Sequence, residues 1–291
     1  MVPKAKILIT GATGFIGSRL ALYLANLGHD VHGLGRSKNT QTHPFQMHWI
    51  DNAFEELRDL IKSIQPDCCF HLATHFKAQH SYEDIPAMID GNIRFGTLLA
   101  DALVQANVPL LVNTGTVWQN YEGKEYSPVC LYAGMKQAFE DILKYYSELH
   151  PLRVLNLKLT DTYGPGDQRR KLLNILRECT LAGKPFQTSD GENWIDLIHV
   201  EDAVAGFTQA WKILRESSEA FQSYRLTSGH PVKIRNLVEL FQKGAGKNIE
   251  IQWNALPQRP REMREPWDAG PVLPGWKAKW SLQDGIRNIM N

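Results

Sequence analysis

Three glycines spaced three residues apart, Gly11, Gly14 and Gly17, constrain this chain more than any other feature of its sequence. They follow a short apolar run, Lys6–Thr10, and lead into a segment, 15–27, whose apolar residues recur at helical spacing. A glycine loop between a buried strand and a helix lets backbone approach a phosphate closely and lets the helix pack against the strand. N–H groups at the helix N-terminus attract an anion. We therefore predict a strand, a loop and a helix that together bind a pyrophosphate.

The residues after the second predicted strand, 30–34, indicate which dinucleotide would be bound. Proteins of this architecture that prefer NAD place an acidic residue there, whereas an arginine accommodates the 2′-phosphate of NADP. This chain has Arg36, after a glycine. The sequence thus favours NADP(H), with NAD(H) as the alternative because arginines at strand ends are often only solvated. A third predicted strand, 47–50, ends at Asp51 and Asn52, which either contact the adenine or cap the next helix.

Strand and helix patterns alternate along the first half of the chain. Helical periodicity is found at 53–64, 88–106 and 131–149. Apolar runs typical of buried strands lie between and after these segments, at 66–73, 110–116 and 152–160. This alternation predicts an α/β protein with a doubly wound parallel sheet of the Rossmann type. The alternation becomes less regular after residue 165.

A tyrosine and a lysine lie four residues apart in the predicted helix 131–149. Tyr132 and Lys136 would share one helix face, and a nearby ammonium favours the phenolate. We therefore expect Lys136 to lower the pKa of Tyr132 from its usual value of about 10. Ordinary helical spacing by chance is the alternative. Thr114 and Thr116 stand at the exit of the strand 110–116, where they either face a ligand crevice or form a turn.

Composition excludes several other classes of protein. The 32 basic and 31 acidic residues of the 291-residue chain give no electrostatic reason to expect nucleic acid or an anionic membrane as a partner. No signal peptide and no membrane-spanning stretch of about 20 apolar residues is recognisable, so we expect a cytoplasmic protein. Neither the four cysteines nor His71 and His75 have metal-ligand spacing, and we predict no metal site.

Two arginine-rich segments lie in the second half of the chain. Arg169, Arg170 and Lys171 are predicted to open a helix that ends near residue 181, and they bind a diphosphate or lie on the surface. The segment 257–265 contains Arg261 between further arginines and prolines. We predict a loop there, which clamps a nucleotide or is solvated.

Taken in order, six short motifs carry a family resemblance. They are Gly11–Gly17, His71–Ala73, Thr114, Tyr132 with Lys136, Tyr163–Asp167 and Asp196–Asp202. Their combination, spread over nearly the whole chain, resembles the extended short-chain dehydrogenases/reductases of the NAD-dependent epimerase/dehydratase family, which act on nucleotide sugars. The resemblance implies a Rossmann domain at 1–165 and a smaller nucleotide-sugar domain at 166–291, with some strands and helices of the second returning to the first. It also implies a homodimer through a four-helix bundle.

The resemblance assigns roles to individual residues. Tyr132 is similar to the catalytic acid/base, Lys136 to the residue that tunes it and holds the nicotinamide ribose, and Thr114 to the hydroxyl that contacts the reacting sugar oxygen. The implied cofactor site comprises Gly11, Thr13, Gly14, Phe15, Ile16, Gly17, Arg36, Asp51, Asn52, Leu72, Ala73, Thr74, Tyr132 and Lys136. The implied substrate site comprises His75, Thr116, Trp118, Asp161, Arg169, Lys171 and Arg261.

Two departures from the family pattern narrow the expected chemistry. Sugar-nucleotide 4,6-dehydratases have an aspartate and a glutamate after the threonine, whereas this chain has Gly115 and Thr116. Elimination therefore lacks its acid and base. Asp161 stands where the family usually has an asparagine near the diphosphate, which places substrate binding there in question.

The compact length of the chain, the strand end Asn113–Thr116 and the segment Asp161–Pro165 resemble a shorter subgroup, the reductases like CDP-abequose and CDP-paratose synthases. It implies NADPH-dependent reduction of the 4-keto group of a nucleoside-diphosphate-linked deoxyhexose, in the synthesis of surface polysaccharides or glycoconjugates. A nucleotide-sugar 4-epimerase with tightly held NAD is the alternative. A cofactor-sensing regulator without catalysis is a third interpretation, which has little need for Tyr132, Lys136 and Thr114 together.

Overall fold

A computed structural model of the chain describes residues 4–36, 42–50 and 56–290. Its centre is a seven-stranded sheet in which every neighbouring pair of strands is parallel. The strands, in spatial order, are β11 (Phe221–Leu226), β6 (Arg153–Leu159), β5 (Leu110–Thr116), β4 (Cys68–His71), β1 (Lys6–Thr10), β2 (Asp30–Gly35) and β3 (Gln46–Trp49). Asp51 and Asn52, predicted to contact the adenine, lie outside the described residues.

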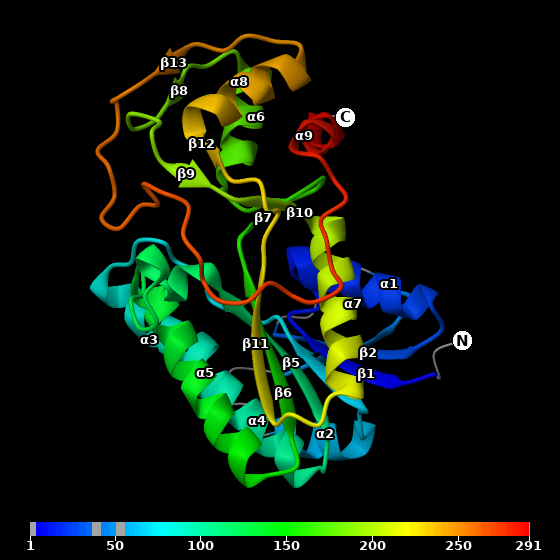
Figure 1. Cartoon of the computed structure of the whole chain (residues 1–291). Helices are drawn as coiled ribbons and strands as arrows, with labels where there is room; N and C mark the ends of the chain where they lie inside the picture. The colour runs from blue at the N-terminus through cyan, green and yellow to red at the C-terminus, as the bar shows by residue number, and fades with distance from the viewer. Residues whose placement is uncertain (1–3, 37–41, 51–55, 291) are drawn as a thin grey trace.

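Helices cover both faces of this sheet (Figure 1). One face packs against α1 (Phe15–Asn26) and α7 (Val200–Glu216), and the other against α2 (Leu57–Ile64), α4 (Phe95–Gln105) and α5 (Leu131–Leu149). Side chains of a strand alternate between the two faces. Accordingly Leu110 and Val112 of β5 enter the first core while Leu111 enters the second. Burial on both faces explains the continuous apolar runs, and the predicted doubly wound Rossmann sheet is confirmed.

The second half of the chain builds a smaller cluster above the carboxyl ends of the strands (Figure 1). It contains α6 (Leu172–Ala182), α8 (Ile234–Ala245) and α9 (Leu282–Met290), which share one hydrophobic core. Three two-stranded sheets accompany them: β7 (Asp161–Tyr163) with β10 (Leu197–His199), β9 (Trp194–Ile195) with β12 (Val232–Lys233), and β8 (Phe186–Gln187) with β13 (Ile251–Gln252). Although β11 and α7 also follow residue 166, they belong to the main sheet and its helical layer. The division at residue 165 stays a prediction.

Two predicted helices differ from the structure. The segment expected as one helix, 88–106, consists of α3 (Ile85–Ile89), a π-helical turn at Asp90–Arg94 and then α4. Arg169, Arg170 and Lys171 do not open a helix, because the backbone of Lys171 is extended and α6 begins only at the next residue. Among the described residues, no helix is long and apolar enough to cross a membrane.

Candidate active site

A cleft of about 530 Å³ opens at the carboxyl ends of the strands. Open parallel sheets bind ligands at this edge because the strand ends and the following helix N-termini converge there. Most of the predicted site residues line it: Gly11, Thr13, Gly14, Phe15, Ile16, Gly17, Arg36, Leu72, Ala73, Thr74, His75, Thr114, Thr116, Trp118, Tyr132, Asp161, Arg169 and Lys171. Lys136 lies beneath this surface, and Arg261 contacts a neighbouring loop. No group of three or more metal-ligating side chains that could hold an ion occurs among the described residues.

The glycine loop forms the floor at one end of the cleft. Gly11 has a φ of +70°, and a Cβ there would lie 2.7 Å from the Ala73 nitrogen. A Cβ on Gly17 would lie 2.2 Å from the Gly11 carbonyl oxygen. Helix α1 begins after Gly14 with no side-chain cap, so backbone N–H groups of its first turn remain for an anion. These residues fit the pyrophosphate of a dinucleotide.

Neighbouring strand ends are joined by a hydrogen-bonded set under the cleft. Thr10 Oγ1 lies 2.7 Å from His71 Nδ1, and the Thr114 hydroxyl donates to the His71 carbonyl oxygen at 2.8 Å. Burial, together with the charge of Lys136, lowers the pKa of His71 to about 3, so the ring is neutral. Because the single Thr114 proton is directed to His71, the lone pairs of Thr114 Oγ1 remain to accept a hydrogen bond.

Tyr132 and Lys136 have the predicted helical arrangement, but the pKa of Tyr132 is shifted in the opposite direction to the predicted one. Both are buried, and Lys136 Nζ lies 5.9 Å from the Tyr132 ring centre and donates to the Thr114 carbonyl oxygen at 3.0 Å. Burial raises the pKa of Tyr132 to about 12, against a smaller lowering by a hydrogen bond with Thr74. Burial also lowers the pKa of Lys136 to about 8. The expectation that Lys136 lowers the pKa of Tyr132 is therefore wrong for the free protein, where desolvation dominates. Tyr132 is protonated at neutral pH.

Phe76 lies in the segment from Thr74 to Tyr82 that was expected to orient the sugar ring, but it was not singled out from the sequence as a site residue. Its ring meets Tyr132 edge to face, with the ring centres 5.0 Å apart, and lies 5.9 Å from the Trp118 ring centre. Lys171 Nζ lies 4.4 Å from the Phe76 ring centre. The available signal was an aromatic residue shortly after the exit of a buried strand.

Asn92, in the π-helical turn, was also missed as a site residue. Its side-chain oxygen accepts hydrogen bonds from the Thr74 hydroxyl at 2.7 Å and from the His75 nitrogen at 3.1 Å. Its amide nitrogen donates to the carbonyl oxygens of His75 and Met88, each at 2.9 Å. The π-helical turn thus places one fully bonded amide where it holds the cleft segment 74–75. Such turns often occur at functional sites.

The two arginines predicted to bind substrate have other partners. Arg169 forms two 2.8 Å contacts with Asp167 and donates to the Thr162 carbonyl oxygen at 2.9 Å. Its guanidinium also lies 4.5 Å from the Phe15 ring centre, and thereby connects the glycine loop to the segment after β7. The structure does not place Arg261 in the cleft lining: it donates to the Pro128 carbonyl oxygen at 2.7 Å.

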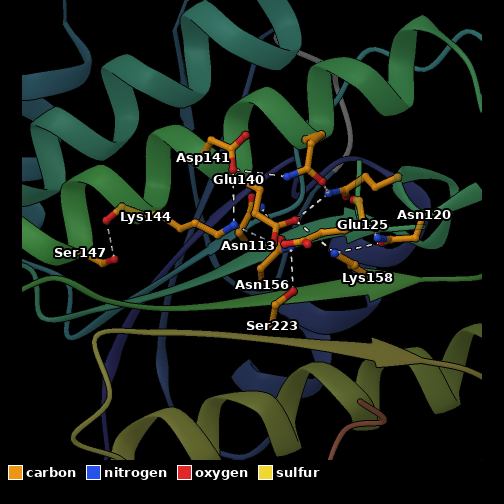
Figure 2. A network of polar contacts seen from close by, with 12 residues as sticks. Asn113, Asn120, Glu125, Glu140, Asp141, Lys144, Ser147, Asn156, Lys158 and Ser223 are labelled. Carbon is orange, nitrogen blue, oxygen red and sulfur yellow. Dashed lines mark hydrogen bonds and ion pairs between the residues drawn. The ribbon is translucent and has the colours of Figure 1, made fainter. Parts of the chain in front are cut away.

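A buried network of charged and amide side chains supports the turn after β5 (Figure 2). Gln119 accepts a hydrogen bond from the Thr116 nitrogen at 2.9 Å and donates to Glu140 at 2.6 Å. Glu140 is 3.4 Å from the Lys158 ammonium, which donates to Asn120 at 3.0 Å. Because the buried carboxylate and ammonium compensate each other, the network holds the turn that carries Thr116 and Trp118 into the cleft.

Comparisons with known proteins agree on the fold and the family. The sequence model of the NAD dependent epimerase/dehydratase family matches residues 7–222. CDP-abequose synthase of Salmonella muenchen is 24% identical over 98% of this chain and 97% of its own length, and UDP-glucose 4-epimerase of Mycolicibacterium smegmatis is 27% identical over 97% and 96%. Two solved structures superpose closely: MoeE5 in complex with UDP-glucuronic acid and NAD, with a TM-score of 0.86 and 24% identity, and the UDP-glucose 4-epimerase of Thermus thermophilus in complex with NAD, with 0.83 and 25%. In both comparisons the matched part covers 98% of this chain and 97% of the solved chain.

Replacing Glu140 by glutamine should destabilise the protein strongly, since it leaves the buried Lys158 ammonium without its counter-charge. We expect a loss of about 3–5 kcal/mol in the free energy of unfolding. Urea denaturation measures this free energy. The double variant with Lys158→Met should regain part of the lost stability. Glu148→Gln, an exposed change on the same helix, is the matched control and should cost less than about 0.5 kcal/mol. Equal effects of the two changes would show that the buried pair does not support the fold.

Burial of Lys136 should make the stability depend on pH. Its pKa is lowered from 10.5 to about 8. Between these pH values the unfolded chain binds one proton more than the folded protein, so stability rises with pH. We expect the wild type to gain up to roughly 3 kcal/mol relative to Lys136→Met from about pH 8 to about pH 10.5. Denaturation across this range measures the difference. Lys62→Met, an exposed control, should parallel the wild type, and a Lys136→Met protein that also did so would contradict the assignment.

Proposed function

This chain belongs to the NAD-dependent epimerase/dehydratase family, and we propose that it reduces the 4-keto group of a nucleoside-diphosphate-linked hexose with NADPH. The observation that carries this proposal is a buried, protonated Tyr132 in the wall of the cleft that Thr114 also lines. A ketone reductase needs a proton donor at this place, whereas an alcohol oxidation begins with a proton acceptor. The similarity to CDP-abequose synthases over nearly the whole chain supports the same reading.

The side chains supply the proton and its orientation. A bound reduced nicotinamide dinucleotide supplies the hydride for the ketone carbon. Tyr132 donates its phenolic proton to the carbonyl oxygen as negative charge develops there. Thr114 Oγ1, whose own proton is directed to His71, accepts a hydrogen bond from the hydroxyl of the product alcohol. Lys136 holds the end of β5 through the Thr114 carbonyl and compensates the phenolate after proton transfer.

Among the described residues, the cleft lining lacks the acid and base that follow the threonine in 4,6-dehydratases. Gly115 and Thr116 follow Thr114, and the Thr116 hydroxyl already accepts a hydrogen bond from the Trp118 nitrogen at 3.3 Å. Among the described residues that line the cleft, the carboxylates are Asp90 and Asp161. Each is paired with a cation, Asp90 with Arg94 and Asp161 with Lys171. Neither stands directly after Thr114, where 4,6-dehydratases have their aspartate and glutamate.

A nucleotide-sugar 4-epimerase is the second candidate. UDP-glucose 4-epimerase of Mycolicibacterium smegmatis is as similar to this chain as the abequose synthases are. An epimerase would use the same Tyr132, first as a base and then as an acid. Arg36, in place of an acidic residue after β2, argues against the tightly held NAD that an epimerase needs.

We also propose a homodimer formed through α4 and α5, which lie side by side on one outer face (Figure 1). Large apolar side chains are exposed along this face: Leu98 is 39% exposed, Tyr145 56% and Leu149 63%. Two helices from each subunit would bury these side chains in a four-helix bundle.

Replacing Tyr132 by phenylalanine should abolish turnover of 4-keto sugar nucleotides and leave cofactor binding intact. The change removes the proton donor and keeps the ring that packs on Phe76. We expect a loss of at least about 100-fold in kcat, the usual contribution of general acid catalysis. Chromatography of the nucleotide released from denatured wild-type protein distinguishes the candidates: stoichiometric NAD would favour the epimerase, and exchangeable NADP the reductase. Near-wild-type kcat in the variant would exclude Tyr132 as the acid.

Arg36 should determine the preference for NADPH. Its exposed side chain lies at the cleft after β2, where it would pair with the 2′-phosphate. A charge-assisted contact of about 1.5–3 kcal/mol predicts that Arg36→Ala raises the KM for NADPH at least about tenfold and leaves that for NADH unchanged. Arg58→Ala, at an exposed arginine of α2 paired with Asp59, is the control. Equal rises for both cofactors would contradict the assignment.

A further inference from the structure

Asp161 and Lys171 form an ion pair in the wall of the cleft. Lys171 Nζ lies 2.6 Å from Asp161 Oδ1, and the two side chains are 24% (Lys171) and 19% (Asp161) exposed. Asp161 begins β7, and Lys171 is the residue directly before α6. Two backbone segments thus bring opposite charges together at a place where both remain accessible from the cleft.

Aromatic rings place this pair close to Tyr132. Lys171 Nζ lies 4.4 Å from the ring centre of Phe76 and 5.7 Å from that of Trp118. Phe76 in turn meets Tyr132 edge to face at 5.0 Å. A single ring therefore separates the ion pair from the proposed proton donor. A group bound by the pair would be part of the reacting hexose or directly attached to it.

The charge of the pair argues against a diphosphate as its ligand. Ammonium and carboxylate sum to zero, and an incoming phosphate would be repelled by Asp161 and would have to displace it from Lys171. Arg169, the other cation beside the pair, already directs its N–H groups to Asp167 and Thr162. Of the three residues of this segment that were predicted to bind a diphosphate, Arg169 and Lys171 are thus each paired with a carboxylate.

Sugar hydroxyls fit the pair better, because each hydroxyl both donates and accepts a hydrogen bond. Among the described residues, no further hydrogen bond is found to the second carboxylate oxygen of Asp161 or to the other ammonium hydrogens of Lys171. The pair therefore offers an acceptor beside donors, with the rings of Phe76 and Trp118 next to them to pack against the apolar face of a sugar. An asparagine at position 161 would carry no charge to hold Lys171 there.

We propose, on the basis of the function proposed above, that Asp161 and Lys171 bind hydroxyl groups of the hexose ring and do not bind the diphosphate. The pair is then a specificity determinant for the sugar. It selects hexoses with a free hydroxyl near the keto carbon and contributes little to the affinity for the nucleotide. The asparagine of the family pattern is replaced by a residue that recruits Lys171 to the sugar.

The ratio of two affinities tests this proposal. Isothermal titration calorimetry of the NADP⁺-saturated protein would compare UDP with UDP-glucose and CDP with CDP-glucose. We expect Lys171→Met and Asp161→Asn each to lower the ratio of sugar-nucleotide to nucleoside-diphosphate affinity about tenfold, the effect of losing one charge-assisted hydrogen bond. Lys233→Met is the matched control, since Lys233 pairs with Glu192 at 2.7 Å and lies 5.9 Å from the Trp194 ring centre, outside the cleft lining. Its ratio should equal that of the wild type.

The outcomes separate this proposal from the function on which it rests. An unchanged ratio in both variants, or an equal loss of affinity for the free nucleoside diphosphates, would overturn the sugar subsite while leaving the reductase proposal standing. A wild-type protein that bound none of these four nucleotides, and none of GDP, dTDP and their glucosyl derivatives, would overturn both. Thermal unfolding of each variant shows whether it is folded, and Asp161→Asn, which keeps the shape of the side chain, decides the question if Lys171→Met does not fold.

Discussion

The Lys136 ammonium, buried beneath the cleft, donates a hydrogen bond to the carbonyl oxygen of Thr114, and the geometry of the site depends on this contact. It ties α5, which carries Tyr132, to the end of β5, which carries Thr114. The Thr114 hydroxyl then reaches the carbonyl of His71 on the next strand. One buried cation thereby aligns two strand ends and a helix. The cost is a desolvated charge, which is seen in the lowered pKa of Lys136.

The same desolvation sets the protonation state of the proposed acid. Tyr132 is surrounded by protein, and burial raises its pKa more than the hydrogen bond with Thr74 lowers it. A proton donor for ketone reduction benefits from this state, because the phenol holds its proton until negative charge develops on the substrate. Buried polar groups around the site are satisfied in a similar way. Glu140 and Lys158 compensate each other, and Asn92 uses its whole amide to hold the segment 74–75.

Much of the fold could be predicted from local patterns. Strands buried on both faces read as continuous apolar runs, and β1, β5 and α5 have the predicted bounds. The prediction was less accurate where a local sequence pattern is compatible with two different backbone structures. The cluster Arg169 to Lys171 is typical of a helix start. In the structure, Arg169 contacts Asp167 and the Phe15 ring, Lys171 pairs with Asp161, and the backbone of Lys171 is extended. The turn at Asp90–Arg94 adds one residue to a helix, and helical periodicity in the sequence does not reveal such an insertion.

The sequence by itself determined the alternation of strands and helices as far as β6, the glycine cradle and the identity of most residues that would meet at the strand ends. These features depend on backbone periodicity and on the need of each glycine for space, which act over a few residues. Only the tertiary structure decided how those residues are charged and paired. The position of Arg261 outside the cleft depends on a segment far away in the chain, and burial of Tyr132 depends on the packing around it. The pairing of Asp161 with Lys171 joins two different elements that lie only ten residues apart. Desolvation and ion pairing act through space, and spacing along the sequence does not report them.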